Sequence, residues 1–220
     1  MGKIPNGILG QISGKVGTVV GSSWKGESYI RALSGKSSKK ATPSQDAVRM
    51  KFKIASAVVK PLMPFVKIGF AANTQHMTSR NRAMQQIITQ CIGGDYPDFR
   101  VDYEKLKLAE GLLPSLIDGR VSSTATGTVD IRWVSDLDNA AAKPTDALLT
   151  AVYCPEINEA VVHKAVADRR VESVSLKMPA HFSGKTVHCY AAFVDSDALF
   201  LKAKPEAISN SSWLGSVVVL

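Results

Sequence analysis

Cysteine is scarce in this sequence, and the few that occur are poorly placed for chemistry. The 220 residues include three cysteines, Cys91, Cys154 and Cys189, and none belongs to a C-x-x-C pair. An odd number without such spacing builds neither a disulfide framework nor a cysteine metal site. We therefore expect these thiols to be buried as small apolar side chains.

Long apolar runs are missing as well. No window approaches the roughly 18 consecutive apolar residues of a transmembrane helix, so no membrane span is expected. The start of the chain is broken by Pro5, Gly7 and Gly10, and it lacks the apolar stretch of a secretory signal. Asn6 stands where the myristoylation pattern requires Ser or Thr. The sequence predicts a cytoplasmic protein or a component of a particle assembled in the cytosol.

Motifs for catalysis or metal binding are also lacking. The histidines show neither H-x₃₋₅-H nor H-E-x-x-H spacing, and no G-x-S-x-G elbow or phosphate-binding glycine loop occurs. His188 and Cys189 are adjacent on a predicted strand, so their side chains point to opposite faces and cannot form a direct pair. We expect no enzymatic activity, no cofactor and no metal.

Two pairs of carboxylates fall in predicted loops, Asp136 with Asp138 and Asp195 with Asp197. Solvated turn residues are the common reading of such pairs, and a weak cation site is the alternative.

Acidic residues are nearly absent from the first 80 positions. That stretch has 13 Lys and Arg against Glu27 and Asp46, a balance of 13 − 2 = +11. Residues 81–220 have 14 basic and 17 acidic residues, a balance of −3, which gives the net charge of +8. This asymmetry suggests an anionic partner, which could be nucleic acid, a membrane surface or an acidic protein face, and a solubilising surface is the alternative.

Glycine is concentrated at the same end. Residues 1–40 include eight of the 16 glycines and seven serines. Strand-like pieces on either side of Gly21–Gly26 predict an extended basic arm with a loose hairpin, followed by a linker over Ser34–Lys40. We expect the arm to dock through apolar and aromatic side chains, namely Val16, Val20, Trp24 and Tyr29.

A helical segment is predicted over residues 41–94. Thr42 is a good N-cap and Pro43 suits the first helical position. The helical period places Val48, Phe52, Ala55 and Val59 on one apolar face. A basic stripe of Arg49, Lys53 and Lys60 lies beside that face.

Prolines 61 and 64 are expected to end or kink this first helix. A second helix is predicted from Thr78 or Ser79 to Ile92, closed by Gly93-Gly94.

Strand signals dominate residues 95–220. Thr128–Val134 alternates apolar and polar residues, and turn signals separate several further strand-length runs. The fold class expected is α+β, with the N-terminal arm, two helices and then an antiparallel β-sandwich. The other predicted strands are Phe99–Leu108, Ala147–Tyr153, Glu159–Ala165, Val171–Met178, Thr186–Val194 and Trp213–Leu220.

The C-terminal part resembles a fibronectin type III or immunoglobulin-like domain. Gly127–Trp133 is similar to the second strand with its core Trp, and Gly184–Val194 to the penultimate strand with its inward aromatic. The Cys…Trp…Cys spacing of true immunoglobulin domains is missing, so their disulfide is not expected.

A second resemblance covers nearly the whole chain. Gly14–Gly26, Tyr29–Arg31, Thr42–Gln45, Arg49–Phe52 and Phe182–Tyr190 together resemble an uncharacterised family of Bacteroidota proteins. That likeness implies a glycine-rich basic start, a helical middle and a sandwich end, and it names no activity. Similar basic starts occur in phage-associated proteins, an analogy that suggests a virion or phage-like particle.

The leading hypothesis is a non-enzymatic structural or interaction protein whose partner is itself or another protein subunit. One alternative is nucleic-acid binding through residues 1–60, with Trp24 and Tyr29 stacking on bases. Another is a sandwich that binds carbohydrate or protein ligands through Tyr153, Phe200 or Trp213. The candidate residues for an anionic partner are Lys15, Lys25, Arg31, Lys36, Lys39, Lys40, Arg49, Lys53 and Lys60.

Overall fold

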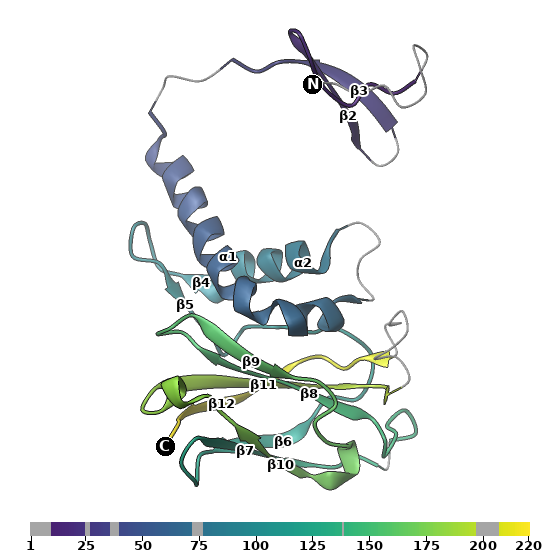
Figure 1. Cartoon of the computed structure of the whole chain (residues 1–220), viewed down its shortest axis with the longest axis vertical. Coiled ribbons are helices and arrows are strands. Elements are labelled where there is room, and N and C mark those ends of the chain that lie inside the picture. The colour runs from purple at the N-terminus through teal and green to yellow at the C-terminus, as the bar shows by residue number, and fades with distance from the viewer. Residues whose placement is uncertain (1–9, 25–26, 36–39, 72–76, 138, 197–206) are drawn as a thin grey trace. The chain divides into compact units, whose positions relative to one another are not determined.

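The structure is a computed structural model that describes the chain except residues 1–9, 25–26, 36–39, 72–76, 138 and 197–206. Its contacts separate two compact units, residues 1–42 and residues 43–220. Each unit has its own architecture (Figure 1).

The N-terminal unit is a small antiparallel sheet with strand order β1-β2-β3. The predicted hairpin is present and gains a third strand, and β2 runs through Gly21 instead of stopping before it. A Cβ on Gly21 would lie 2.0 Å from the carbonyl oxygen of Ile12, so only glycine fits beneath that residue. The strands are β1 (Gly14–Val16), β2 (Val19–Trp24) and β3 (Glu27–Ala32).

Two of the residues predicted to dock this arm are exposed in the structure. Val16 and Tyr29 are each 46% exposed, and all six residues of β3 are exposed. Val20 is half-buried, and the side chain of Trp24 lies outside the described part of the chain. A sheet of three short strands has no second layer of its own to cover its faces.

The second unit begins with two helices, α1 (Pro43–Gly69) and α2 (Ser79–Gln86), and α2 continues into a π-helical turn, η3 (Ile87–Cys91). Helix α1 starts at Pro43, directly after Thr42, as the capping signal predicts. It passes through Pro61 and Pro64 without ending and changes direction along its length (Figure 1). Thr78 caps α2 by accepting a hydrogen bond from the backbone N–H of Asn81 at 3.2 Å.

The apolar face predicted for α1 is displaced along the helix. Ala55 and Val59 are buried, whereas Val48 is 55% and Phe52 51% exposed. The covered stretch continues toward the C-terminal end, through Val58, Leu62, Phe65 and Val66. The first three turns of α1 therefore carry an apolar stripe that this unit does not bury.

The predicted antiparallel sandwich is confirmed. A three-stranded sheet of order β10-β7-β6 faces a four-stranded sheet of order β12-β11-β8-β9. The strands are β6 (Ile117–Ser122), β7 (Thr128–Val134), β8 (Ala147–Cys154), β9 (Glu159–His163), β10 (Ser173–Lys177), β11 (Thr186–Val194) and β12 (Ser212–Val218). The 3-10 turns are η4 (Arg169–Val171) and η5 (Ala180–Phe182).

Two features of this region differ from the predicted strands. Strand β6 has no counterpart among them, and Phe99–Leu108 forms only β5 (Arg100–Val101), which pairs with β4 (Ile92–Gly93). Leu106 and Leu108 are nonetheless buried in the core, so their apolar character reflects burial beside a helix and not strand pairing.

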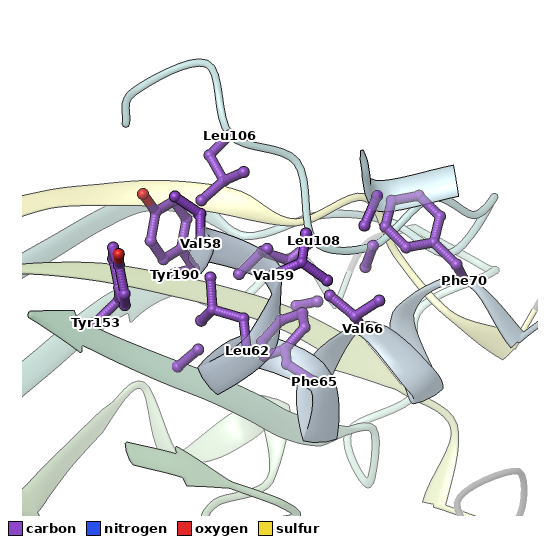
Figure 2. Close-up of a cluster of buried hydrophobic side chains, with 14 of the residues drawn as sticks. Val58, Val59, Leu62, Phe65, Val66, Phe70, Leu106, Leu108, Tyr153 and Tyr190 are labelled. Atoms are coloured by element: carbon purple, nitrogen blue, oxygen red, sulfur yellow. The ribbon is translucent and has the colours of Figure 1, made fainter. Parts of the chain in front are cut away.

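Helix α1 packs on β8 and β9, which makes the second unit three-layered. One core lies between the helices and the four-stranded sheet, and the other lies between the two sheets. Figure 2 shows the first core, where Leu62 and Phe65 of α1 gather with Leu108 and the sheet residues Tyr153 and Tyr190. All eight residues of β8 are buried because both of its faces are covered.

The cysteines are in the interior of the second unit. Cys91, Cys154 and Cys189 are all free and buried. Within the described ranges, neither helix has the length and apolar character needed to cross a bilayer.

Candidate interaction surfaces

The strand register gives the N-terminal sheet two different faces. Lys15, Val20 and Arg31 are direct neighbours across the three strands, and Tyr29 lies on the same face, two residues before Arg31. Lys15, Tyr29 and Arg31 are exposed. This basic face brings together two predicted contacts for an anionic partner, Lys15 and Arg31, and the predicted stacking residue Tyr29.

The opposite face of the sheet is apolar. Val16, Val19 and Ala32 form one cross-strand row, and Ile30 lies on the same face beside Gly21. Ile30 is 59% exposed, while Ile12 covers Gly21. The small sheet is therefore amphipathic, with a basic face and an apolar face that are both accessible within this unit.

The remaining basic candidates of the arm are less well placed. Lys40 is exposed in the segment before α1. Lys25, Lys36 and Lys39 lie outside the described residues. Trp24 is the last residue of β2 and pairs with Glu27, and its side chain is also outside the description.

The predicted basic stripe of α1 is exposed. Lys53 and Lys60 are open to solvent, and the side chain of Arg49 is 70% exposed. Arg49 makes an ion pair with Asp46 at 3.3 Å, one turn earlier. Nearby, the ammonium group of Lys51 lies 4.9 Å above the ring centroid of Phe99.

The thiols have the environment of structural residues. Burial raises the pKa of Cys91 to about 11 and that of Cys189 to about 12, so both remain protonated at neutral pH. Cys189 lies between the sheets, whereas the ring of His188 lies 4.6 Å from Tyr103 on the helix side. The two neighbours therefore face apart, as strand alternation requires.

The described residues contain no group of three or more His, Cys, Asp or Glu side chains that could hold a metal ion. Of the paired carboxylates, Asp195 forms an ion pair with Lys143, with 2.7 Å between Asp195 Oδ2 and Lys143 Nζ. Asp138 and Asp197 lie outside the described residues. The Asp195 carboxylate is thus engaged by the protein itself.

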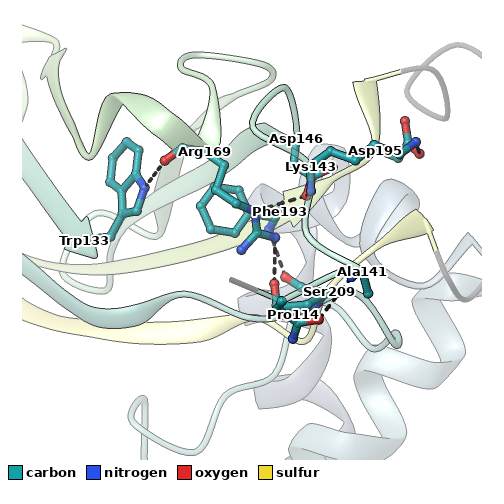
Figure 3. A network of polar contacts seen from close by, with 10 residues as sticks. Pro114, Trp133, Ala141, Lys143, Asp146, Arg169, Phe193, Asp195 and Ser209 are labelled. Atoms are coloured by element: carbon teal, nitrogen blue, oxygen red, sulfur yellow. Dashed lines mark hydrogen bonds and ion pairs between the residues drawn. The ribbon is translucent and has the colours of Figure 1, made fainter. Parts of the chain in front are cut away.

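A buried ion pair that sequence reasoning missed joins β8 to the turn before β10. Asp146 and Arg169 are each 1% exposed, and Arg169 Nε donates to Asp146 Oδ2 at 3.0 Å. Figure 3 shows the guanidinium also donating to the Pro114 carbonyl oxygen at 2.8 Å and lying over the Phe193 ring. The indole of Trp133 donates to the Arg169 carbonyl oxygen at 2.8 Å.

This network links Trp133 of one sheet to Phe193 of the other through Arg169. Nothing in the sequence marks it, since a single Asp in a turn and a single Arg in Arg169-Arg170 are ordinary surface residues. The guanidinium of Arg169 is met by protein acceptors, while Asp146 Oδ1 is buried without a hydrogen-bond partner in the described structure. These contacts are those of a structural element.

Of the three candidates for an aromatic patch that binds a carbohydrate or protein ligand, the two in the described residues are buried or partly buried. Tyr153 is 2% exposed and belongs to the core beneath α1, where its ring lies 5.7 Å from that of Tyr103. Trp213 is partly buried against the same core. Phe200 lies outside the described residues.

Comparisons with known proteins address the fold and the family. No match was found among curated proteins. One similar solved structure is a computationally redesigned β-sandwich protein, with 11% identity, a TM-score of 0.33 and coverage of 50% of this chain and 94% of that one. Another is the fibronectin type III domain of human contactin 1, with 9% identity, a TM-score of 0.34 and coverage of 58% and 93%.

The family assignment rests on a match over most of the sequence. Residues 11–215 match a family whose description is a family of unknown function, DUF6266. The match includes the amphipathic sheet, both helices and nearly all of the sandwich, and the chain therefore belongs to the DUF6266 family.

Proposed function

We propose that this chain is a non-enzymatic structural or interaction protein that assembles with further copies of itself through its N-terminal sheet. The three-layered unit of residues 43–220 serves as the rigid body in this proposal. One observation carries it: Val16 and Ile30, on the apolar face of a sheet of three short strands, are 46% and 59% exposed. Such a sheet is marginally stable until one face is covered, and a partner surface provides that cover.

The apolar face commits the partner to being a protein. Burial of Ile30 and Val16 against another apolar surface is favourable, whereas a phosphate backbone has no apolar surface for them to contact. Assembly of many copies into a particle, such as a phage-like one, is the larger form of the same proposal.

The test is the molar mass of the full chain, measured by size-exclusion chromatography with light scattering over a concentration series. We expect a mass above that of the 23.6 kDa protomer at high concentration. Ile30→Asp, on the apolar face, is expected to return the protein to the protomer mass. Leu112→Asp is the matched control, because Leu112 is 72% exposed and lies outside this sheet. A strict monomer at every concentration would overturn self-assembly.

A second candidate function is favoured by the opposite face of the same sheet. The row Lys15–Val20–Arg31 with Tyr29 beside it has the charge and the aromatic ring that suit a nucleic-acid backbone and a stacked base. Such binding weakens steeply with salt because each neutralised phosphate releases counterions.

This candidate is tested by the salt dependence of duplex DNA binding. The double variant K15A/R31A is expected to reduce the slope of log K against log salt by about 1.8, since two phosphate contacts are lost. The matched control is K67A/K177A, which removes two exposed charges from other elements. An absence of retention at low salt would eliminate this function without affecting self-assembly.

A further inference from the structure

A hollow lies between the two helices on the surface of the second unit. It has a volume of about 370 Å³ and opens between Phe52 of α1 and the side chains of α2 and η3. A second hollow lies closer to the start of α1, one turn before Phe52, and is lined by Ser44, Gln45, Val48 and Arg49. The lining residues contributed by α2 and η3 are Asn81, Met84, Gln85, Ile88 and Thr89.

The spacing of the lining residues is helical on both sides. Those from α2 and η3 follow the pattern i, i+3, i+4, i+7 and i+8, and those from α1 are one turn apart. Each stripe extends over about 12 Å of helix axis at 1.5 Å per residue. Together, the stripe on α1 and the stripe on α2 and η3 offer a groove for a third helix.

The floor of this groove is apolar. Phe52 and Val48 are 51% and 55% exposed, and Met84 and Ile88, which line the first hollow with Phe52, are partly buried. The first three turns of α1 therefore present a row of apolar side chains that a partner helix would cover.

The surroundings of the groove are positively charged. Helix α1 has five basic residues and one acidic residue, a balance of +4, and α2 adds Arg80 and Arg82 without an acidic residue, a balance of +2. Arg49 lines the groove, and Arg80 reaches α1 by donating to Ser56 Oγ at 2.9 Å, one turn beyond Phe52. No Asp or Glu lines either hollow.

From this geometry we infer that the groove binds an acidic amphipathic helix of another protein, with its apolar side on Phe52, Met84 and Ile88 and its carboxylates toward Arg49 and Arg80. A second copy of this chain does not supply such a helix from its described residues, because α1 and α2 are both basic and would repel the groove. The surface is distinct from the N-terminal sheet, so this inference stands or falls independently of the proposed self-assembly.

The probe is a fluorescein-labelled synthetic helix of about 14 residues, long enough to span both stripes. It has Leu at i, i+3, i+4 and i+7 and Glu on its flanks. Fluorescence anisotropy with the full chain is expected to show saturable binding. Two control peptides are each expected to bind at least about tenfold more weakly. One has Lys in place of Glu, and the other is a scrambled peptide of identical composition.

Two variants locate the binding on the groove. Phe52→Ser removes an exposed aromatic anchor and is expected to weaken binding of the Glu peptide at least about tenfold. Arg49→Glu is expected to have a similar effect through charge. Lys67→Glu makes the same charge change at the other end of α1, away from both hollows, and is expected to leave affinity within about twofold. Circular dichroism melts verify that each variant is folded.

Three results would overturn the inference. One is an absence of saturable binding by the Glu peptide. Another is equal binding of the Glu, Lys and scrambled peptides, and the third is unchanged affinity in the folded Phe52→Ser variant. If the chain does not bind the peptide but dimerises, and Phe52→Ser abolishes the dimer, a second copy covers this groove instead.

Discussion

At the scale of single residues, the buried Asp146–Arg169 pair gives the clearest prediction about stability. Both side chains are 1% exposed, so the removal of one partner leaves an uncompensated charge in the interior. Arg169→Met is expected to lower the free energy of unfolding by about 3–5 kcal/mol. The double variant D146L/R169M should lose less than this single variant, because it buries no lone charge. Urea unfolding followed by tryptophan fluorescence measures both.

Arg170→Met is the control for these two variants. Arg170 is next in sequence, its side chain is 63% exposed, and its ion pair with Asp168 at 3.4 Å is on the surface. Its replacement should change stability by less than about 0.5 kcal/mol. Equal losses for Arg169→Met and Arg170→Met would contradict the structural role of the buried pair.

His188 predicts a pH dependence of stability. Burial lowers its pKa below the usual value near 6.5, and its Nδ1 is buried without a hydrogen-bond partner in the described structure. The unfolded chain then binds the proton more readily than the folded one as the pH falls through 6.5. The stability contributed by neutral His188 is present above that pH and is lost as the pH falls toward the lowered value.

The measurement is urea stability at pH 7.5, 6.5 and 5.5 for the wild-type chain and for His188→Phe, which keeps the ring beside Tyr103. The stability of the wild-type chain is expected to fall more steeply with decreasing pH, by less than about 1 kcal/mol since the group is only half-buried. The difference between the two proteins should stay constant above pH 7.5. A parallel decline in both proteins at low pH would exclude His188 as the cause.

At the scale of elements, α1 divides into a packed half and an open half. Leu62 is fully buried, and Leu62→Ala is expected to cost about 2–5 kcal/mol through the cavity it leaves. Val48→Ala, in the open half, should cost less than about 0.5 kcal/mol. Thermal or urea melts of the two variants compare them directly. Similar losses would show that the first turns of α1 are also packed in solution.

The same helix shows what a sequence pattern can and cannot predict. The 3.6-residue period correctly predicted a helix from Pro43 and correctly included Ala55 and Val59 in its buried face. Period alone does not say where along a helix the neighbouring layer begins, and Val48 and Phe52 fit the pattern without being covered. The exposed apolar stripe is therefore visible only once the sandwich is in place.

The strands divide in a similar way. Strands β7 and β11 have the predicted bounds, since the first alternates cleanly and the second ends at turn signals. Strand β6 escaped prediction because Gly119 and a register shift between Ile117 and Arg120 break its alternation. Leu106 and Leu108 look like strand residues because alternate side chains are buried there, although the backbone makes no ladder.

The candidate site was partly readable from sequence. The charge asymmetry pointed to Lys15 and Arg31, but only the strand register shows that they share a face with Tyr29 and oppose Ile30. Register depends on turn geometry and cross-strand pairing, which a glycine-rich stretch specifies weakly. For the same reason, the division of the arm into a basic and an apolar face was not predicted.

At the scale of the whole molecule, the two units should differ sharply in stability. Gly21 is the only fully buried residue among those described in the N-terminal unit, whereas every residue of β8 is buried in the second unit. Amides of β2 and β3 in a dilute sample should therefore exchange with solvent through local opening of low free energy, while those of β8 and β11 exchange only on global unfolding. Hydrogen exchange followed by mass spectrometry resolves these classes.

Protein concentration is the second variable in this hydrogen-exchange experiment. If the sheet docks on another copy, the amides of β2 and β3 should become protected as protein concentration rises, because binding adds its free energy to the stability of the bound form. In the Ile30→Asp variant the amides of β2 and β3 should stay unprotected at every concentration. Exchange in β8 should be the same in both proteins, since Ile30 lies outside that unit's core. Concentration-independent protection of β2 and β3 equal to that of β8 would instead mean that the small sheet is stable without a partner.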